Sequence, residues 1–167
     1  MKIGIFYGST TGNTANIAEK IASALGVESG NVRNIADSGP EDLRDCDVVI
    51  FGSSTWGLGE LQDDWHAAID KFAKLDLSGK KVAIFGCGDS FSYPDTFCNS
   101  IGAIYDALSG TGCAFIGAYE PTDYNAKDSA VCKNGKFVGL AIDDDDDESK
   151  TKDRIEKWAA QLKSEFA

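Results

Sequence analysis

The sequence has little of what a metal centre, a nucleophilic catalyst or a disulfide framework requires. It holds one histidine, His66, and five cysteines, and no two of these cysteines are separated by only two residues. An odd number of thiols without that spacing favours reduced cysteines over a disulfide framework. A zinc site or a Ser-His-Asp triad would need partners for His66 that no local motif supplies. We therefore expect His66 to be a surface residue on a helix, and we expect no metal.

Positive charge is also scarce. The chain has 16 Lys and Arg residues against 27 Asp and Glu residues, a formal net charge of −11, and its pI is near 4.4. Because nucleic acids and anionic membranes attract basic surfaces, this balance excludes both as expected partners and favours basic ones. No hydrophobic run approaches the length of a bilayer span, and the first residues do not resemble a signal peptide. These features predict a cytoplasmic protein.

Apolar residues are abundant enough for a core: 43% of the 167 residues are hydrophobic, which is typical of one α/β domain spanning 1–167. Short apolar runs predict strands at 2–7, 31–35, 46–52 and 80–86, and a fifth strand in two pieces near 113–118 and 137–142. Helical periodicity predicts helices at 13–26, 61–74, 97–110 and 150–166, with a short turn at 40–44. This alternation is typical of a doubly wound parallel sheet with helices on both faces.

The segment between the first strand and the first helix is rich in hydroxyl groups. A helix begins there, so unpaired backbone N–H groups and the positive end of the helix dipole would favour an anion. No Lys or Arg lies between Lys2 and Lys20, which suits one terminal phosphate better than a polyphosphate. The alternative is a capped turn without a ligand. The candidate phosphate ligands are Ser9, Thr10, Thr11, Gly12, Asn13 and Thr14.

Two further loops follow predicted strands on the same side of the sheet, where doubly wound folds bind their ligands. Residues 53–59 and 86–93 each carry a large aromatic residue, Trp56 or Tyr93, among glycines and small polar residues. The two rings can hold a flat group between them by stacking. The alternative is that both aromatic side chains pack on the protein itself. A phosphate seat with an aromatic pair predicts a phosphorylated planar cofactor.

Four segments carry a resemblance to one family. They are Ser-Thr-Thr-Gly-Asn-Thr at 9–14, Thr-Trp-Gly-x-Gly at 55–59, and the segments 85–98 and 135–143. Together they resemble the long-chain flavodoxins of bacteria and algae. The resemblance implies a flavodoxin-like three-layer sandwich, with a five-stranded parallel sheet of order 2-1-3-4-5 whose fifth strand is interrupted by residues 119–136. One departure is Ser54, where many relatives have proline.

The resemblance also implies a cofactor, flavin mononucleotide (FMN), bound without a covalent link. Residues 9–14 with Thr55 would hold its phosphate, and Trp56 and Tyr93 would cover the two faces of the ring. The dimethylbenzene edge would stay in solvent as the exit for electrons. The other residues that the resemblance places at the ring are Ser54, Gly57, Leu58, Gly59, Cys87, Gly88, Asp89 and Cys98.

Two features of the sequence bear on the redox chemistry of such a flavin. The Gly57–Leu58 peptide can flip cheaply because glycine tolerates positive φ, so its carbonyl can accept the N5 proton of a neutral semiquinone. We therefore expect a well-populated semiquinone. The acidic run 143–148 follows the fifth strand on the ligand side, where it would disfavour an anionic reduced flavin and lower its potential. The alternative is a solvated loop whose charges are screened by salt.

The predicted function is a monomeric, low-potential one-electron carrier rather than an enzyme. It would dock transiently on basic-faced redox proteins, such as a flavodoxin or ferredoxin reductase and low-potential acceptor enzymes. One alternative is an FMN-dependent NAD(P)H quinone reductase of related fold, which needs a nicotinamide pocket. The other is a phosphoacceptor signalling domain, which needs an Asp directly after the third strand, where this chain has Ser53 and Ser54.

Overall fold

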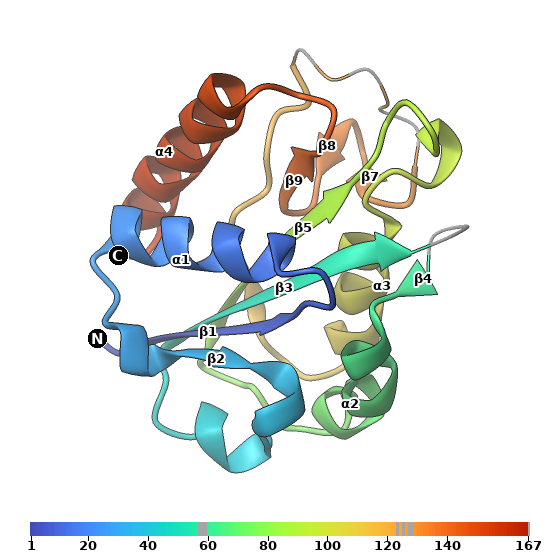
Figure 1. The fold of residues 1–167 in the computed structure, drawn as a ribbon. Helices are drawn as coiled ribbons and strands as arrows, with labels where there is room; N and C mark the ends of the chain where they lie inside the picture. Colours follow the sequence, from blue (N-terminus) through green and yellow to red (C-terminus); the bar gives the residue numbers. More distant parts are fainter. Residues whose placement is uncertain (57–59, 123, 125, 127–128, 167) are drawn as a thin grey trace.

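A parallel sheet lies at the centre of the computed structural model, which describes residues 1–56, 60–122, 124, 126 and 129–166 (Figure 1). The strand order is β2-β1-β3-β5-β6, and β9 also pairs with β5, so β6 and β9 are the two predicted pieces of one fifth strand. The predicted order 2-1-3-4-5 is confirmed. The strands of this sheet are β1 (Ile3–Gly8), β2 (Val32–Asn34), β3 (Val48–Trp56), β5 (Lys81–Gly88), β6 (Ala114–Phe115) and β9 (Leu140–Asp143), with β4 (Glu60–Leu61) antiparallel to β3.

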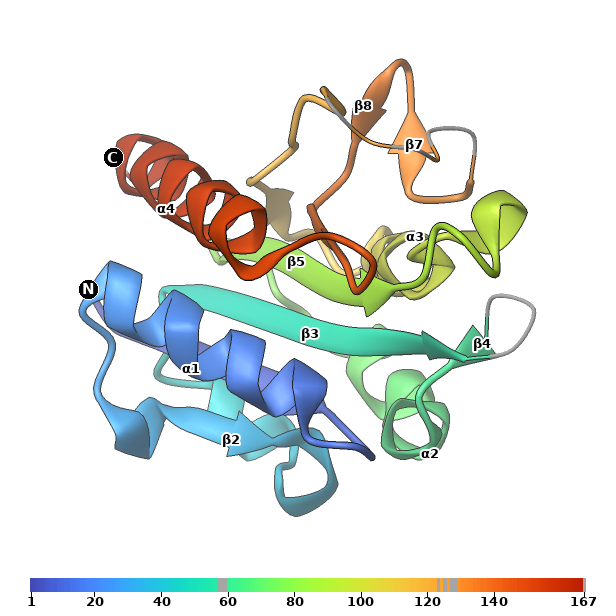
Figure 2. The same ribbon diagram turned by 45° about the horizontal axis from the view of Figure 1, so that its top comes forward.

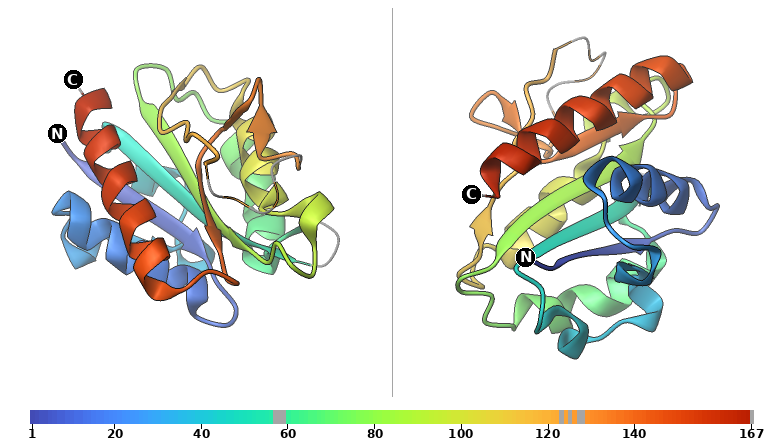
Figure 3. Two further views of the ribbon diagram at one scale, coloured as in Figure 1. Left: turned by 90° about the horizontal axis from the view of Figure 1, so that it is seen from above. Right: turned by 90° about the vertical axis from the view of Figure 1, so that its left-hand side faces the viewer.

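Helices cover both faces of the sheet, as predicted. Helices α1 and α4 lie on one face, and α2 and α3 lie on the other (Figures 2 and 3). The predicted turn at 40–44 is a short 3-10 helix, Pro40–Leu43. The helices are α1 (Asn13–Leu25), α2 (Asp63–Ala73), α3 (Asn99–Leu108) and α4 (Glu148–Glu165).

The core has two layers because side chains alternate along each strand. In β3, Val48 and Ile50 pack with the apolar faces of α1 and α4, whereas Phe51 packs with α2 and α3. A large buried indole fixes each layer: Trp65 Nε1 donates a hydrogen bond to the Gly52 carbonyl at 2.7 Å, and Trp158 Nε1 donates to Gly117 at 2.8 Å. Burial on both faces explains why the central strands read as continuous apolar runs.

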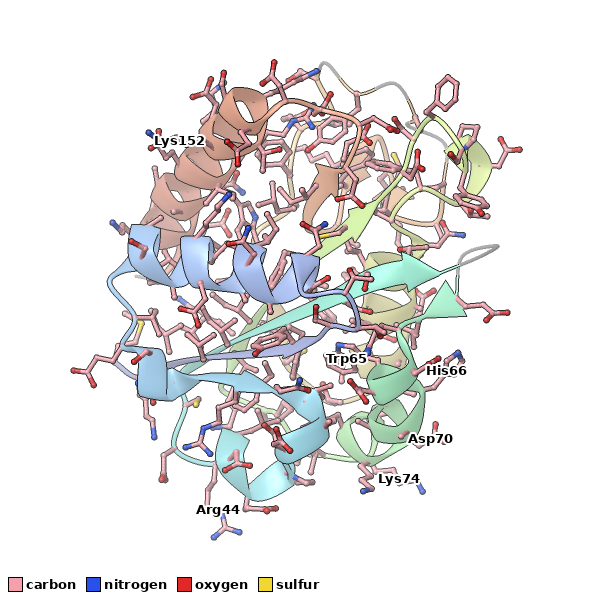
Figure 4. The ribbon with its side chains drawn as sticks, viewed as in Figure 1. Arg44, Trp65, His66, Asp70, Lys74 and Lys152 are labelled. Atoms are coloured by element: carbon pink, nitrogen blue, oxygen red, sulfur yellow. The ribbon has the colours of Figure 1, made fainter. Side chains whose placement is uncertain are left out.

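The lone histidine lies on the surface of a helix, as predicted. His66 is exposed on the outer side of α2, as is Asp70, whereas Trp65 is buried (Figure 4). All five cysteines are free thiols. In the part of the chain that the structure describes, no group of His, Cys, Asp and Glu side chains could hold a metal ion. None of the described helices combines the length and the apolar character needed to cross a membrane.

The chain between β6 and β9 contains a small hairpin that we did not predict. Strand β7 (Cys132–Lys133) pairs with β8 (Lys136–Phe137), and the turn between them has positive φ at Asn134 and Gly135. This turn gives the twist that a two-residue hairpin needs. The side chain of Tyr124 anchors the segment to β9, because its hydroxyl donates a hydrogen bond to the Ala141 carbonyl at 2.7 Å.

Candidate cofactor site

The loop between β1 and α1 leaves the N-terminus of the helix open to solvent. Gly12 is the N-cap residue of α1, with φ of 90°, and no side chain among the described residues caps the helix. The side chains from Thr10 to Asn13 are exposed, whereas Ser9 is half-buried and its Oγ accepts a hydrogen bond from the Gly12 N–H at 3.1 Å. The positive end of α1 is therefore presented to solvent, where an anion can reach it.

Thr14 provides the test of whether this loop fits a phosphate. It is 1% exposed, and its Oγ1 is buried without a hydrogen-bond partner among the described residues. A buried hydroxyl in that state is costly, and a phosphate oxygen would give it an acceptor. Thr10 is also prepared to donate, because its Oγ1 accepts from Gln62 Nε2 at 3.0 Å and keeps its own proton available. The residues of the loop thus fit a phosphate group.

A pocket of about 90 Å³ opens at the same edge of the sheet, beyond the ends of β3, β5 and β9. A flavin ring is larger than this volume, so the described walls would enclose only part of it. The structure brings together predicted residues from two separate loops and adds three that we did not assign to the site, of which Asp144 belongs to the acidic run expected on this side of the sheet. The lining residues are Ser54, Thr55, Cys87, Gly88, Asp89, Tyr93 and Cys98, together with Thr96, Phe97 and Asp144.

One predicted part of the site lies outside the described residues. The backbone of Trp56 ends β3, but its side chain is not among the described groups, and neither are residues 57–59. The stacking role of Trp56, the flip of the Gly57–Leu58 peptide, and the contacts of Leu58 and Gly59 therefore stay predictions.

Close packing against α3 fixes the floor of the pocket. A Cβ atom on Gly88 would lie 2.9 Å from the Cys98 backbone nitrogen, so only glycine lets the two segments approach this closely. Cys98 itself precedes α3 with a φ of 53°. Thr55 Oγ1 donates to Ser100 Oγ at 2.8 Å and accepts from the Ser100 N–H at 3.1 Å. These contacts place Thr55 in the pocket wall and tie β3 to the start of α3.

The two thiols in the pocket are protonated at neutral pH. Burial raises the pKa of Cys87 to about 12, with Asp144 adding to the rise and the nearby Thr14 hydroxyl opposing it. Sulfur is a weak hydrogen-bond acceptor, so this contact leaves the Thr14 hydroxyl available to a stronger partner. Burial likewise raises the pKa of Cys98 well above its ordinary value. A neutral buried thiol is not a nucleophile, so neither cysteine serves covalent catalysis.

The acidic run after β9 is divided between structural and site-facing carboxylates. Asp143 is 1% exposed and accepts hydrogen bonds from the N–H and the hydroxyl of Ser90. Asp147 caps α4 by accepting from the Lys150 N–H at 2.8 Å. Asp144 instead lines the pocket, and its Oδ1 accepts from Asn13 Nδ2 of the β1–α1 loop at 2.6 Å. Asp144 therefore links the β1–α1 loop to the pocket.

Asp144 should make the ligand-free protein less stable at higher pH. The residue is exposed overall, but desolvation of its carboxyl group raises its pKa from 3.8 to about 6, against the opposing effect of the Asn13 hydrogen bond. Stability from a raised carboxyl pKa is present below the unfolded value and is lost as the pH rises through the folded value. We expect Asp144→Asn to raise the melting temperature of the apoprotein at pH 7.5 and to have no effect near pH 4.

Thermal unfolding of the wild type and Asp144→Asn across this pH range measures the effect. Asp70→Asn, which removes a charge from the outer side of α2, controls for net charge. An Asp144→Asn variant that is stabilised equally at both pH values would contradict the assignment.

The fold and the rim together define an α/β protein with a pocket at the edge of its sheet, beside a loop whose residues fit a phosphate. The family model described as flavodoxin matches residues 5–158. A flavodoxin from Nostoc sp. is 41% identical over 165 residues, covering 99% of this chain and 97% of the relative. One from Synechococcus elongatus is 42% identical over 166 residues, covering 99% and 98%.

A solved structure agrees with these relatives. The Fusobacterium nucleatum flavodoxin bound to flavin mononucleotide superimposes with a TM-score of 0.91 at 29% identity and covers 99% of each chain. The chain therefore belongs to the flavodoxin family, as its motifs predicted. It is an electron-transfer protein and not an enzyme.

Proposed function

We propose that this chain holds FMN at the rim formed by the ends of β1, β3, β5 and β9 and uses it to carry single electrons at low potential. The observation that carries the proposal is the buried Thr14 hydroxyl at the start of α1, which among the described residues has no partner stronger than the neighbouring thiol of Cys87. When bound, FMN supplies the one-electron chemistry of its ring. The protein supplies the binding, the orientation and the surrounding charge.

Each part of the site has its own role in this proposal. Residues 9–14 would bind the phosphate through N–H groups and hydroxyls, which accounts for the absence of a cation in the loop. Tyr93, together with Trp56, would flank the ring. Asp89 and the backbone of Cys87 and Gly88 would contact its polar edge. Asp144 adds negative charge beside the pocket, which disfavours a further negative charge on the reduced ring.

A reductive titration tests the proposal against the quinone reductase, which the comparisons do not favour. The protein loaded with FMN should take up two electrons in two separate one-electron steps, and NADPH alone should leave its visible absorbance unchanged. Spectroelectrochemistry resolves the steps, and mixing with NADPH in the absence of a reductase tests the second expectation. Rapid bleaching by NADPH alone would contradict an electron carrier and support the reductase.

We also propose that the protein acts as a cytoplasmic monomer that docks transiently on basic-faced redox proteins, such as a flavodoxin or ferredoxin reductase and low-potential acceptor enzymes. The net charge of −11 supports this proposal. Attraction between opposite charges steers association and is screened by salt. Electron transfer from a basic reductase should therefore slow several-fold between about 50 and 500 mM salt. Stopped-flow kinetics measures this, and a rate that does not change with ionic strength would exclude steering.

For the domain organisation, we propose one flavodoxin-like domain over residues 1–167, with residues 119–136 as an insertion into the fifth strand, as in long-chain members. The pairing of both β6 and β9 with β5 supports this division. Deleting the insertion and measuring FMN retention separately from partner turnover would show whether it serves structure or docking.

A further inference from the structure

The loop that follows β5 exposes its aromatic side chain and buries its polar one. Phe91 is 86% exposed, whereas its neighbour Ser90 is 4% exposed. Folding alone favours the opposite arrangement, since apolar side chains gain most from leaving water. Phe91, Tyr93 and Met1 are the large hydrophobic side chains exposed in the described part of the chain, and two of them lie on this loop. Phe91 therefore forgoes the free energy that burial of its ring would contribute, and it lies on the same loop as the exposed ring of Tyr93.

Hydrogen bonds hold this loop in place. The Phe91 N–H donates to Asp89 Oδ1 at 3.1 Å and to Asp145 Oδ2 at 2.8 Å, and the Ser92 N–H donates to Asp89 Oδ1 at 2.9 Å. Ser90 donates hydrogen bonds from its N–H and its hydroxyl to the buried carboxylate of Asp143. The backbone around Phe91 is thus held within its own loop by Asp89. Asp145 also holds it to the loop between β9 and α4. Phe91 is presented to solvent by a preorganised backbone, which lowers the entropic cost of binding through it.

The surroundings of Phe91 are acidic. Asp89 and Asp145 hold its amide, and the exposed Asp95 follows on the same loop. An apolar centre with a charged rim is the usual organisation of a protein interface, and aromatic side chains are enriched among the residues that dominate binding. A second copy of this chain would bring the same carboxylates and a net charge of −11, so it would be repelled. The charges select a basic partner.

We propose that Phe91 is the apolar anchor of a docking surface formed by residues 89–95 and Asp145, and that its partner is a redox protein with an apolar hollow rimmed by Lys and Arg side chains. The inference rests on the proposed electron-carrier function and names the surface that the partner contacts. Docking there would bring the partner to the edge of the pocket, because Asp89 and Tyr93 belong to both the surface and the pocket wall.

The test uses oxidised cytochrome c as the probe, since it is a basic redox protein with an apolar haem edge surrounded by lysines. The FMN-loaded wild type is compared with Phe91→Ala and with Phe91→Leu, which keeps an apolar side chain. Binding is measured directly by NMR titration at low ionic strength and again at two higher salt concentrations. We expect Phe91→Ala to weaken binding by about tenfold and Phe91→Leu by less than about threefold. The salt dependence should be the same for all three proteins.

Asp95→Asn is the matched charge control, and it should lower the salt dependence while leaving the apolar contribution intact. Phe91→Ala should keep the melting temperature and FMN affinity of the wild type, because the side chain is 86% exposed. Equal affinity of the wild type and Phe91→Ala would overturn the inference, and so would a loss of stability that parallels the loss of binding. A wild type that does not turn yellow with FMN refutes the proposed function instead, so the two failures are distinguishable.

Discussion

Thr14→Val should weaken FMN binding by about 10- to 100-fold and leave riboflavin binding unchanged. Hydrogen bonds to charged groups contribute about 1.5–3 kcal/mol, and about 1.4 kcal/mol corresponds to a factor of ten in affinity. Among the described residues the buried Thr14 hydroxyl has only its weak contact with the Cys87 thiol, so a phosphate oxygen would be its first strong acceptor. Valine has nearly the same shape but no hydroxyl. The measurement is a fluorescence titration of the apoprotein with each ligand.

The same variant should not lose stability, although it loses affinity for FMN. An unsatisfied buried hydroxyl costs the folded protein about 1–3 kcal/mol, so the apoprotein of Thr14→Val should be at least as stable as the wild type. Weaker FMN binding by an equally stable protein cannot be attributed to misfolding. Ser23→Ala removes an exposed hydroxyl from the same helix and should change neither quantity. Unchanged FMN affinity in Thr14→Val would show that this hydroxyl does not serve the phosphate.

Tyr93→Ala should weaken FMN and riboflavin binding alike, by about 10- to 100-fold. Removing a large ring from contact with a flat ligand loses about 1.5–3 kcal/mol of apolar burial, together with the stacking contribution. Tyr93 is 46% exposed and lines the pocket, and its N–H is held by the Asp89 carbonyl at 3.0 Å. Its side chain can therefore be removed with little change to the backbone around it.

Tyr93→Phe separates the ring from the hydroxyl group and should retain most of the affinity for both ligands. A Tyr93→Ala variant that binds both flavins as tightly as the wild type would remove Tyr93 from the ring site. A Tyr93→Ala variant that loses affinity for FMN but not for riboflavin would instead place Tyr93 near the phosphate. The contrast with Thr14→Val thus assigns each residue to one part of the ligand.

The sheet was predictable because the central strands are buried on both faces and carry an unbroken apolar signal. The end of β3 was not, since residues 53–56 are polar or aromatic, and they extend the strand by pairing with β5 at Ser53 and Ser54. The start of α2 was predicted two residues early. Residues 60–61 pair with β3 instead, and the Gln62 side chain then caps the helix by accepting from the Asp64 N–H at 3.0 Å. Such boundaries depend on tertiary contacts that periodicity does not report.

The site was predictable at the level of loops, because strand order determines which loops meet at one edge of the sheet. The individual residues of the site were harder to predict. Asp144 could be found only as a member of an acidic run, and nothing in that run indicates that Asp143 would be buried against Ser90 while Asp144 contacts Asn13. Thr96 and Phe97 belong to the segment 85–98 that carries the resemblance, but we did not assign them to the site, since they reach the pocket only through the path of the chain into α3. The hairpin β7–β8 has a sequence signal in Asn134-Gly135, a pair typical of two-residue hairpin turns.

The most direct test is a titration of the purified wild-type apoprotein with FMN and, separately, with riboflavin. A seat for one phosphate beside a pocket for a flat ring predicts a saturable yellow complex with FMN at one equivalent, with quenched tryptophan fluorescence. It also predicts that riboflavin, which lacks the phosphate, binds at least about 100-fold more weakly. Apoprotein that stays colourless in excess FMN, or that binds both flavins equally well, would contradict the proposed site.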